Sequence, residues 1–293
     1  MFDLRYHVAS LAAVFLALII GILVGAGLAA RTDVEGTERR VLQQRIDELR
    51  QRNQDLSDQT DLLRREREAA DNYVNATYLP VMNGRLRGKR VALLFIGESD
   101  QAVLEAVDQT LQDASAPGLV EQEALELPVS PEEVERALEP QFSGLTMDEV
   151  GRRLGEELVE GGETPFWIAL TPVLVQENRG TPSVEVDAVV VSHTGRATDA
   201  PTSLFLEGLY AGLARSGVPV VGIERTNQEA SRIAMYKANG ISSVDSVDTP
   251  IGKLALAVLL EGGPEGHYGV KRTAENGTLP AIEPLPLAPL PGG

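Results

Sequence analysis

A single uncharged stretch near the N-terminus, Val8–Ala30, constrains this chain more than any other feature. A helix of this length, rising about 1.5 Å per residue, covers the ~30 Å hydrocarbon core of a bilayer. A cleaved signal peptide would have a shorter apolar region, of roughly 7–15 residues. We therefore interpret residues 8–30 as a transmembrane anchor, with a signal peptide as the alternative.

Two features of this segment bear on how the anchor is used. Gly21 and Gly25 form a G-x-x-x-G pair, which lets two membrane helices approach closely and so indicates an oligomerisation face. Basic residues are more numerous after the span than before it, which by the positive-inside rule would place the downstream side in the cytoplasm. Acidic residues are interleaved with those arginines, and the residues alone leave the orientation open.

The composition excludes several functional classes. The chain has 293 residues, no cysteine and a formal net charge of −17. Without cysteine there are no disulfides, thiolate metal sites or cysteine nucleophiles. The negative charge argues against binding to nucleic acid or to anionic lipid. Aromatic residues make up only 4% of the chain, so we expect no stacking platform for bases or sugars.

Residues 37–75 carry a seven-residue repeat that is typical of a coiled coil. Four successive core positions of one kind, called d, are leucines: Leu42, Leu49, Leu56 and Leu63. Asn53 lies at the other core position, a, where a buried asparagine fixes the register of a two-stranded coil at some cost in stability. We expect Gly36 to interrupt the helix between the membrane and this repeat, and Thr37 to cap its continuation.

The charges beside this seam leave the partner open. In a parallel homodimer Arg45 would face Arg50 of the partner, and Glu66 would face Asp71. Like charges at these positions disfavour that pairing, so a heteromeric or antiparallel partner is an alternative. A third alternative is a single amphipathic helix that packs on the protein's own domain.

The region 88–272 alternates strand-like and helix-like patterns. Apolar runs predict strands at residues 91–96, 166–170, 186–191 and 218–223. Helical spacing of apolar residues predicts helices at residues 101–114, 203–215 and 251–260. Alternation of this kind predicts a doubly wound, mostly parallel sheet with helices on both faces, in a Rossmann-like α/β domain.

Two charged or biased segments flank this domain. A basic cluster precedes it and is interpreted as a solvated linker, with a phosphate or lipid contact as the alternative: Arg85, Arg87, Lys89 and Arg90. Residues 279–293 contain five prolines, which exclude helix and sheet and favour an extended or disordered tail. Pro286 and Pro289 have the P-x-x-P spacing of a docking segment, although a tail without a partner is the simpler interpretation.

Any ligand of a doubly wound sheet is expected beyond the carboxyl ends of its strands. Three loops qualify, at residues 97–100, 192–196 and 224–227. None contains a dinucleotide fingerprint, P-loop, nucleophile elbow or zinc-protease motif. His193 has the chemistry of a base, but no matched nucleophile accompanies it, and we expect it to cap its loop. We predict no catalytic residue and no enzymatic activity.

Potential metal ligands are scattered. The histidines, His7, His193 and His267, lie far apart in the sequence, and so do the four methionines. Copper(I) favours thiolate and thioether ligands, and copper(II) favours imidazole. His193 and His267 are therefore only weak candidate ligands, and we expect no resident cofactor and no tight copper site within one chain.

Two stretches nevertheless carry a resemblance. Residues 4–28 (LRYHVASLAAVFLALIIGILVGAGL) and residues 241–271, with a G-x-x-G-H-Y-G element at 263–269, resemble the mycobacterial copper transport protein B family of actinobacterial envelope proteins. The resemblance implies a membrane-anchored cell-envelope protein whose bulk lies outside the cytoplasm. It also implies a role in copper export or homeostasis, with copper as the transported ion, and it supplies no catalytic residue set.

A second interpretation keeps the same architecture without copper. One anchor cannot line a pore unless several assemble, and its only polar residue is Ser10. A non-catalytic envelope scaffold would use the coiled coil to recruit a cell-wall or division partner. Copper binding by the ectodomain and the copper sensitivity of a deletion strain would distinguish the two.

Overall fold

The computed structural model describes residues 4–161, 164–180, 185–195, 199–228 and 230–285, and for residues 4, 5 and 28–38 it describes the backbone only. The chain divides into two compact units, Met1–Ala70 and Asp71–Gly293. The first unit is helical throughout its described residues, and the second contains the sheet.

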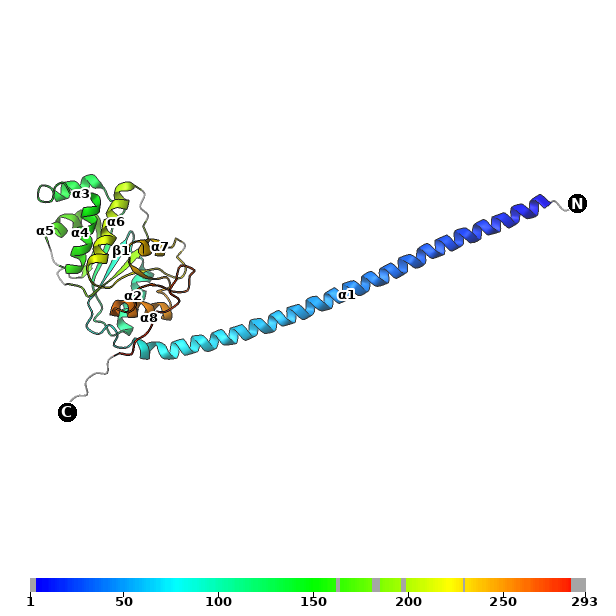
Figure 1. Ribbon diagram of the computed structural model, residues 1–293, viewed down its shortest axis with the longest axis horizontal. Coiled ribbons are helices and arrows are strands. Elements are labelled where there is room, and N and C mark those ends of the chain that lie inside the picture. The colour runs from blue at the N-terminus through cyan, green and yellow to red at the C-terminus, as the bar shows by residue number, and fades with distance from the viewer. Residues whose placement is uncertain (1–3, 162–163, 181–184, 196–198, 229, 286–293) are drawn as a thin grey trace, which may run out of the picture. The chain divides into compact units, whose positions relative to one another are not determined.

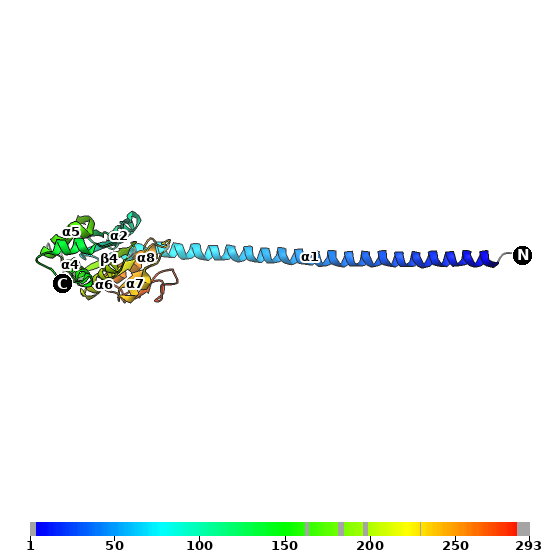
Figure 2. The same cartoon turned by 90° about the horizontal axis from the view of Figure 1, so that it is seen from above.

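Helix α1 runs over Leu4–Met82 and is drawn as one continuous helix (Figure 1, Figure 2). Its segment Tyr6–Gly27 is long and apolar enough to cross a membrane, a test that an N-terminal signal sequence also passes. The expected interruption at Gly36 is wrong, because this residue lies inside the helix. A single glycine costs a helix about 1 kcal/mol relative to alanine, and helix-favouring neighbours on both sides outweigh that cost.

The second unit is built on a seven-stranded sheet in the order β3-β2-β1-β4-β5-β6-β7. Its strands are β1 Val91–Ile96, β2 Leu119–Leu125, β3 Val175–Gly180, β4 Ala188–His193, β5 Val220–Ile223, β6 Ser242–Val244 and β7 His267–Tyr268. Neighbouring strands are parallel except at the edge, where β3 runs antiparallel to β2. The sheet is therefore mostly parallel, as the sequence predicts.

Helices cover both faces of this sheet (Figure 1). They are α2 Gln101–Asp113, α3 Pro131–Leu138, α4 Met147–Glu160, α5 Pro165–Leu174, α6 Ala200–Arg215, α7 Ile233–Ala238 and α8 Pro250–Glu261. Helices α2 and α8 and the end of α1 pack on one face, and α3 to α7 pack on the other. This three-layer arrangement confirms a mixed α/β domain of the doubly wound type.

The predicted strand at residues 166–170 is wrong, because these residues form helix α5. The Thr164 hydroxyl accepts a hydrogen bond from the Trp167 backbone N–H at 3.0 Å, and Pro165 opens the first turn. A capping threonine followed by proline is a helix-start signal that outweighs a short apolar run. The sequence analysis did not predict strands β2, β3, β6 and β7 or helices α3, α4 and α7, although Val150, Leu154 and Leu158 of α4 have helical spacing.

Helices α4 and α6 pack with their backbones in contact. Each helix contributes two glycines one turn apart, namely Gly151 and Gly155 on α4 and Gly208 and Gly212 on α6. A Cβ atom at Gly151 would lie 2.0 Å from the Phe205 carbonyl oxygen, and one at Gly212 would lie 2.1 Å from that of Arg152. Only glycine allows this approach, so the small-xxx-small pattern of these helices sets the spacing of the layer.

The basic cluster before the sheet is not a solvated linker throughout. The Arg85 side chain is 4% exposed and lies 2.7 Å from a Glu261 carboxylate oxygen at the end of α8. Arg90 pairs with Asp187 at 3.0 Å. The beginning of the proline-rich tail is also held, since Leu279 packs against the core and the Glu283 carbonyl accepts from Arg85 at 3.1 Å.

Arg85 therefore ties the end of α1, helix α8 and residues 279–285 together, because a guanidinium can donate to several acceptors at once. The sequence could not reveal its buried partner. The P-x-x-P spacing at Pro286 and Pro289 lies outside the described residues.

Candidate functional site

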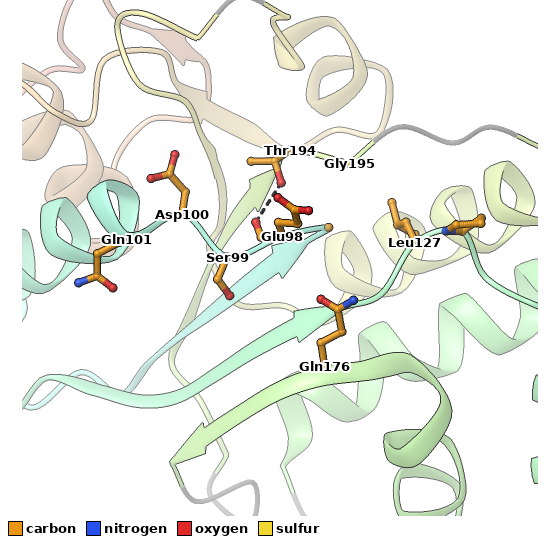
Figure 3. A pocket seen from close by; sticks show the side chains of 10 residues that line it. Glu98, Ser99, Asp100, Gln101, Leu127, Gln176, Thr194 and Gly195 are labelled. Atoms are coloured by element: carbon orange, nitrogen blue, oxygen red, sulfur yellow. Dashed lines mark hydrogen bonds between the residues drawn. The ribbon is translucent and has the colours of Figure 1, made fainter.

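The connectivity of the sheet creates a topological switch point beside β1. The chain leaves β1 through α2 towards β2, and later places β4 on the opposite side of β1. Open α/β sheets bind ligands in the crevice at such a point, outside the carboxyl ends of the strands. A crevice of about 720 Å³ lies there, between the loops that follow β1, β2 and β4 (Figure 3).

Two glycines bring the walls of this crevice together. Gly97 follows β1 with φ +98°, and a Cβ atom there would lie 2.6 Å from the Gly195 backbone nitrogen. A Cβ atom at Gly195 would lie 2.6 Å from the Leu127 side chain. The Gly195 N–H donates to the Ile96 carbonyl at 2.9 Å, which fixes the loop after β4 against the end of β1.

Polar groups line the floor of the crevice (Figure 3). The Thr194 hydroxyl donates to the Glu98 carbonyl at 3.0 Å, and the Ser99 hydroxyl donates to Glu177 at 3.0 Å. The Asp100 carboxylate caps helix α2 by accepting from the Ala102 N–H at 2.9 Å. These hydrogen bonds give Thr194, Ser99 and Asp100 structural roles. Among the described lining residues no nucleophile is paired with a base.

The structure brings together the three loops that sequence analysis selected. Residues 97–100 and the end of the 192–196 loop line the crevice, and Arg225 of the third loop pairs with Asp100 at 2.9 Å. Arg196 lies outside the described residues. Because the lining carries Glu98 and Asp100, and the arginine beside it is already paired, the crevice is suited to neutral or cationic polar ligands rather than to phosphates.

His193 ends strand β4 and is 2% exposed. Its Nδ1 lies 2.8 Å from the Tyr210 hydroxyl of α6. Burial, and then the positive charge of Arg232, lower the pKa of His193 to about 4, while the nearby Gly195 backbone opposes them. The imidazole is therefore neutral at physiological pH, and it is held by the Tyr210 hydroxyl of α6.

His267, the other weak metal candidate, begins strand β7 and lies 2.9 Å through Nδ1 from the Ser243 hydroxyl. Burial, followed by the charge of Lys237, lowers its pKa. Strands β5 and β6 separate it from His193, a distance of about 14 Å at the usual strand spacing. His7 lies on α1, and across the described part of the chain no three acidic, histidine or cysteine side chains gather as a metal site.

The candidate oligomerisation residues all lie on helix α1. A Cβ atom added at Gly21 or at Gly25 would meet nothing within 4 Å in the single chain. The four heptad leucines are 59–64% exposed: Leu42, Leu49, Leu56 and Leu63. Asn53 is exposed as well. These residues form no ligand site within the described part of one chain.

The G-x-x-G-H-Y-G element at residues 263–269 and the residues that follow it have a structural role. The fully buried Asp245 carboxylate accepts from the backbone N–H groups of Val270 and Lys271 at 2.8 and 3.0 Å. A Cβ atom at Gly269 would lie 1.9 Å from the nearer oxygen of this carboxylate, so only glycine fits there. The Lys271 ammonium then pairs with the buried Glu224 carboxylate at 3.1 Å. The segment after β7 is thus locked onto the ends of β5 and β6 by buried charges that have partners.

The family model "Copper transport outer membrane protein, MctB" matches residues 1–122 and 160–279, which include α1 and all seven strands at least in part. The chain belongs to the MctB family. Curated MctB relatives from Mycobacterium bovis and from the CDC 1551 and H37Rv strains of Mycobacterium tuberculosis are each 26% identical over 324 residues, covering 95% of this chain and 99% of theirs. Each is named as a copper transporter, and none as an enzyme.

Both stretches that carry the resemblance, residues 4–28 and 241–271, lie within the regions matched to the MctB family, whereas α3 and most of α4 lie outside them. Gly269, the last glycine of the G-x-x-G-H-Y-G element, leaves room for the Asp245 carboxylate, and it lies within the matched MctB region. Sequence reasoning missed Glu121, Glu123, Tyr210 and Arg232, whose importance comes from burial and from partners distant in sequence.

Proposed function

We propose that this chain is a single-pass cell-envelope protein with a role in copper export or homeostasis. The observation that carries the proposal is the MctB match, which includes the apolar N-terminal helix as well as the sheet. An apolar helix of this length is expected to stay in the membrane as an anchor. The α/β domain then acts without an enzymatic site.

The proposed orientation places Met1–His7 in the cytoplasm and the α/β domain outside it. The positive-inside count opposes this orientation, because basic residues are more numerous after the span. The outer-membrane description of the MctB family supports a location of the bulk outside the cytoplasm. A net charge of −17 also favours a domain that stays away from anionic lipid surfaces.

Copper is the cargo in this proposal, and the ectodomain is not its tight binding site. His193 and His267 are held by Tyr210 and Ser243 and lie on strands separated by two others. A single apolar helix offers only Ser10 as a polar side chain. The path for copper would therefore come from several assembled anchors or from a partner protein.

We expect a phosphatase reporter at the C-terminus to be active and a reporter that needs the cytoplasm to be silent. We also expect a deletion strain to be copper-sensitive, and a His193→Gln/His267→Gln variant to restore tolerance almost as well as the wild-type chain. Immunoblotting would confirm equal protein levels. A silent phosphatase reporter would refute the orientation, and normal copper tolerance of the deletion strain would refute the copper role.

A second candidate function is a non-catalytic scaffold that recruits a cell-wall or division partner through residues 37–75. It is favoured by the exposure of the heptad leucines in the single chain, where Leu49 and Leu63 are 63% and 64% exposed. Such a stripe is normally covered in a coiled coil. A second copy of the chain, paired in parallel with Asn53 setting the register, suits two helices anchored in the same membrane.

Replacing Asn53 by leucine is expected to raise the melting temperature of the paired helices and to permit additional oligomeric states, since the buried amide lowers stability while fixing register. Asn72→Leu is the matched control, because residue 72 lies outside the a and d positions. Circular dichroism melting and analytical ultracentrifugation of the 37–75 peptide and of the full chain measure both effects. If both are monomeric at high concentration, the homodimer is rejected and a different partner helix is required.

A further inference from the structure

A second cavity, of about 460 Å³, lies between helices α6 and α7 and shares no lining residue with the crevice at the switch point. Its wall combines His193, Tyr210 and Arg232 with the apolar side chains of Leu206, Met235 and Ala238. Cavities of this size, largely apolar with a few converging polar groups, are typical of small-molecule sites. Neither the family name nor the proposed copper role assigns anything to it.

The Arg232 side chain lacks an acidic partner among the described residues, which is unusual in so acidic a chain. Its Nη2 donates to the Gly195 carbonyl at 2.6 Å, and it forms no ion pair with any residue that the structure describes. Its Nε is buried and also lacks an acceptor within the described residues. A buried N–H of a charged guanidinium without an acceptor is costly, so an anionic ligand would stabilise it.

The second free donor is His193. The buried Tyr210 hydroxyl finds no acceptor other than His193 Nδ1 among the described residues, so the hydroxyl donates its proton there. A neutral imidazole that accepts at Nδ1 carries its own proton at Nε2. That Nε2 is buried and has no hydrogen-bond partner within the described residues. The site therefore presents a second N–H donor beside a cation, an arrangement that repels metal ions.

We propose that this cavity binds a small monocarboxylic acid with an apolar body. The carboxylate accepts from Arg232 Nε–H and His193 Nε2–H, and the body packs against Leu206, Met235 and Ala238. Glu207 is exposed at the rim and disfavours ligands with two or more negative charges. Both donor nitrogens are buried in the wall of the cavity, and the flexible thioether of Met235, which also lines it, gives way as the ligand enters.

The test uses the full chain in lipid nanodiscs, titrated calorimetrically with 3-phenylpropionate at pH 7 after subtraction of an empty-nanodisc titration. We expect saturable binding of one equivalent, and at least tenfold weaker binding of 3-phenylpropanamide, which has the same shape without the charge. Equal binding of the acid and the amide, or no binding of the acid, would overturn the proposal. Binding of inorganic phosphate in preference to the acid would overturn the ligand class.

Variants assign the binding to this cavity. Arg232→Gln should weaken 3-phenylpropionate binding at least tenfold, and Arg232→Lys should weaken it less, because it keeps the charge but loses the Nε–H donor. Arg225→Gln, in a neighbouring loop where the arginine is already paired with Asp100, should leave binding unchanged. If Arg232→Gln fails to fold, the Arg232→Lys variant and the acid–amide comparison on the wild-type chain still decide. Unchanged binding in a folded Arg232→Gln variant would place the ligand elsewhere and reject the site.

Discussion

Replacing Gly212 by alanine is expected to destabilise the α/β domain by about 3 kcal/mol. Its Cβ atom would lie 2.1 Å from the Arg152 carbonyl oxygen, and a backbone atom cannot move aside as the end of a flexible side chain can. Helices α4 and α6 would have to separate along their whole contact, since Gly151, Gly155 and Gly208 face the opposite backbone in the same way. Urea unfolding of the full chain, followed by the fluorescence of its single tryptophan, Trp167, measures the loss.

The matched control for this change is Gly25→Ala. It makes the same substitution inside a helix, at a glycine with nothing within 4 Å in the single chain. Helix propensity favours alanine over glycine by about 1 kcal/mol, so this variant should not destabilise the domain. Trp167 is 5% exposed within the core that α4 and α6 share, so its emission reports on this layer. If Gly212→Ala unfolds at the wild-type urea concentration, the backbone contact between the helices is not as described.

Replacing Glu123 by glutamine is expected to remove the loss of stability that this carboxyl causes as the pH rises from about 4.5 to about 8. Glu123 is 1% exposed on β2, with Glu121 beside it on the same face of the sheet. Burial, and then the charge of Glu121, raise the pKa of the Glu123 carboxyl from 4.5 to about 8. Neither of its carboxylate oxygens has a hydrogen-bond partner within the described residues.

The direction of this effect follows from linkage. Because the folded state binds this proton more tightly than the unfolded state, the stability is fully present below pH 4.5 and is lost as the pH rises through the folded pKa near 8. The free energy of unfolding of the wild-type chain, relative to that of Glu123→Gln, should fall by a few kcal/mol across this window, because the opposite contribution of the buried His193 is common to both chains. Urea unfolding at several pH values measures the difference between the two curves.

Glu126→Gln is the control for charge removal, because Glu126 is exposed just beyond the same strand. Its stability curve should run parallel to that of the wild-type chain. Parallel curves for Glu123→Gln and wild type would show that Glu123 ionises normally, and the buried acidic pair would then not be a source of pH dependence.

The sequence by itself determined the features that depend on local periodicity. The uncharged stretch at residues 8–30 predicts an apolar helix long enough to cross a membrane, and the structure has an apolar helix at Tyr6–Gly27. The continuous apolar run at residues 91–96 is strand β1 to the residue. Asp100 and Thr249, which cap α2 and α8, mark helix starts that the sequence also predicted to within one residue. The three loops at the carboxyl ends of β1, β4 and β5 followed from the same alternation.

Only the tertiary structure decided what depends on neighbours distant in sequence. Strand β2 carries Glu121 and Glu123 and has no strand-like apolar pattern, yet its residues from Glu121 to Leu125 are buried, because β1 and β3 flank it in the sheet and helices cover both faces. The sequence predicts a solvated Arg85, whereas in the structure its guanidinium lies 2.7 Å from the Glu261 carboxylate. Packing between elements also decided three further features. These are the pairing of His193 with Tyr210, the Arg232 Nε that has no acceptor among the described residues, and the glycine contact between α4 and α6. Periodicity records which face of an element is buried, but it does not record which element covers that face.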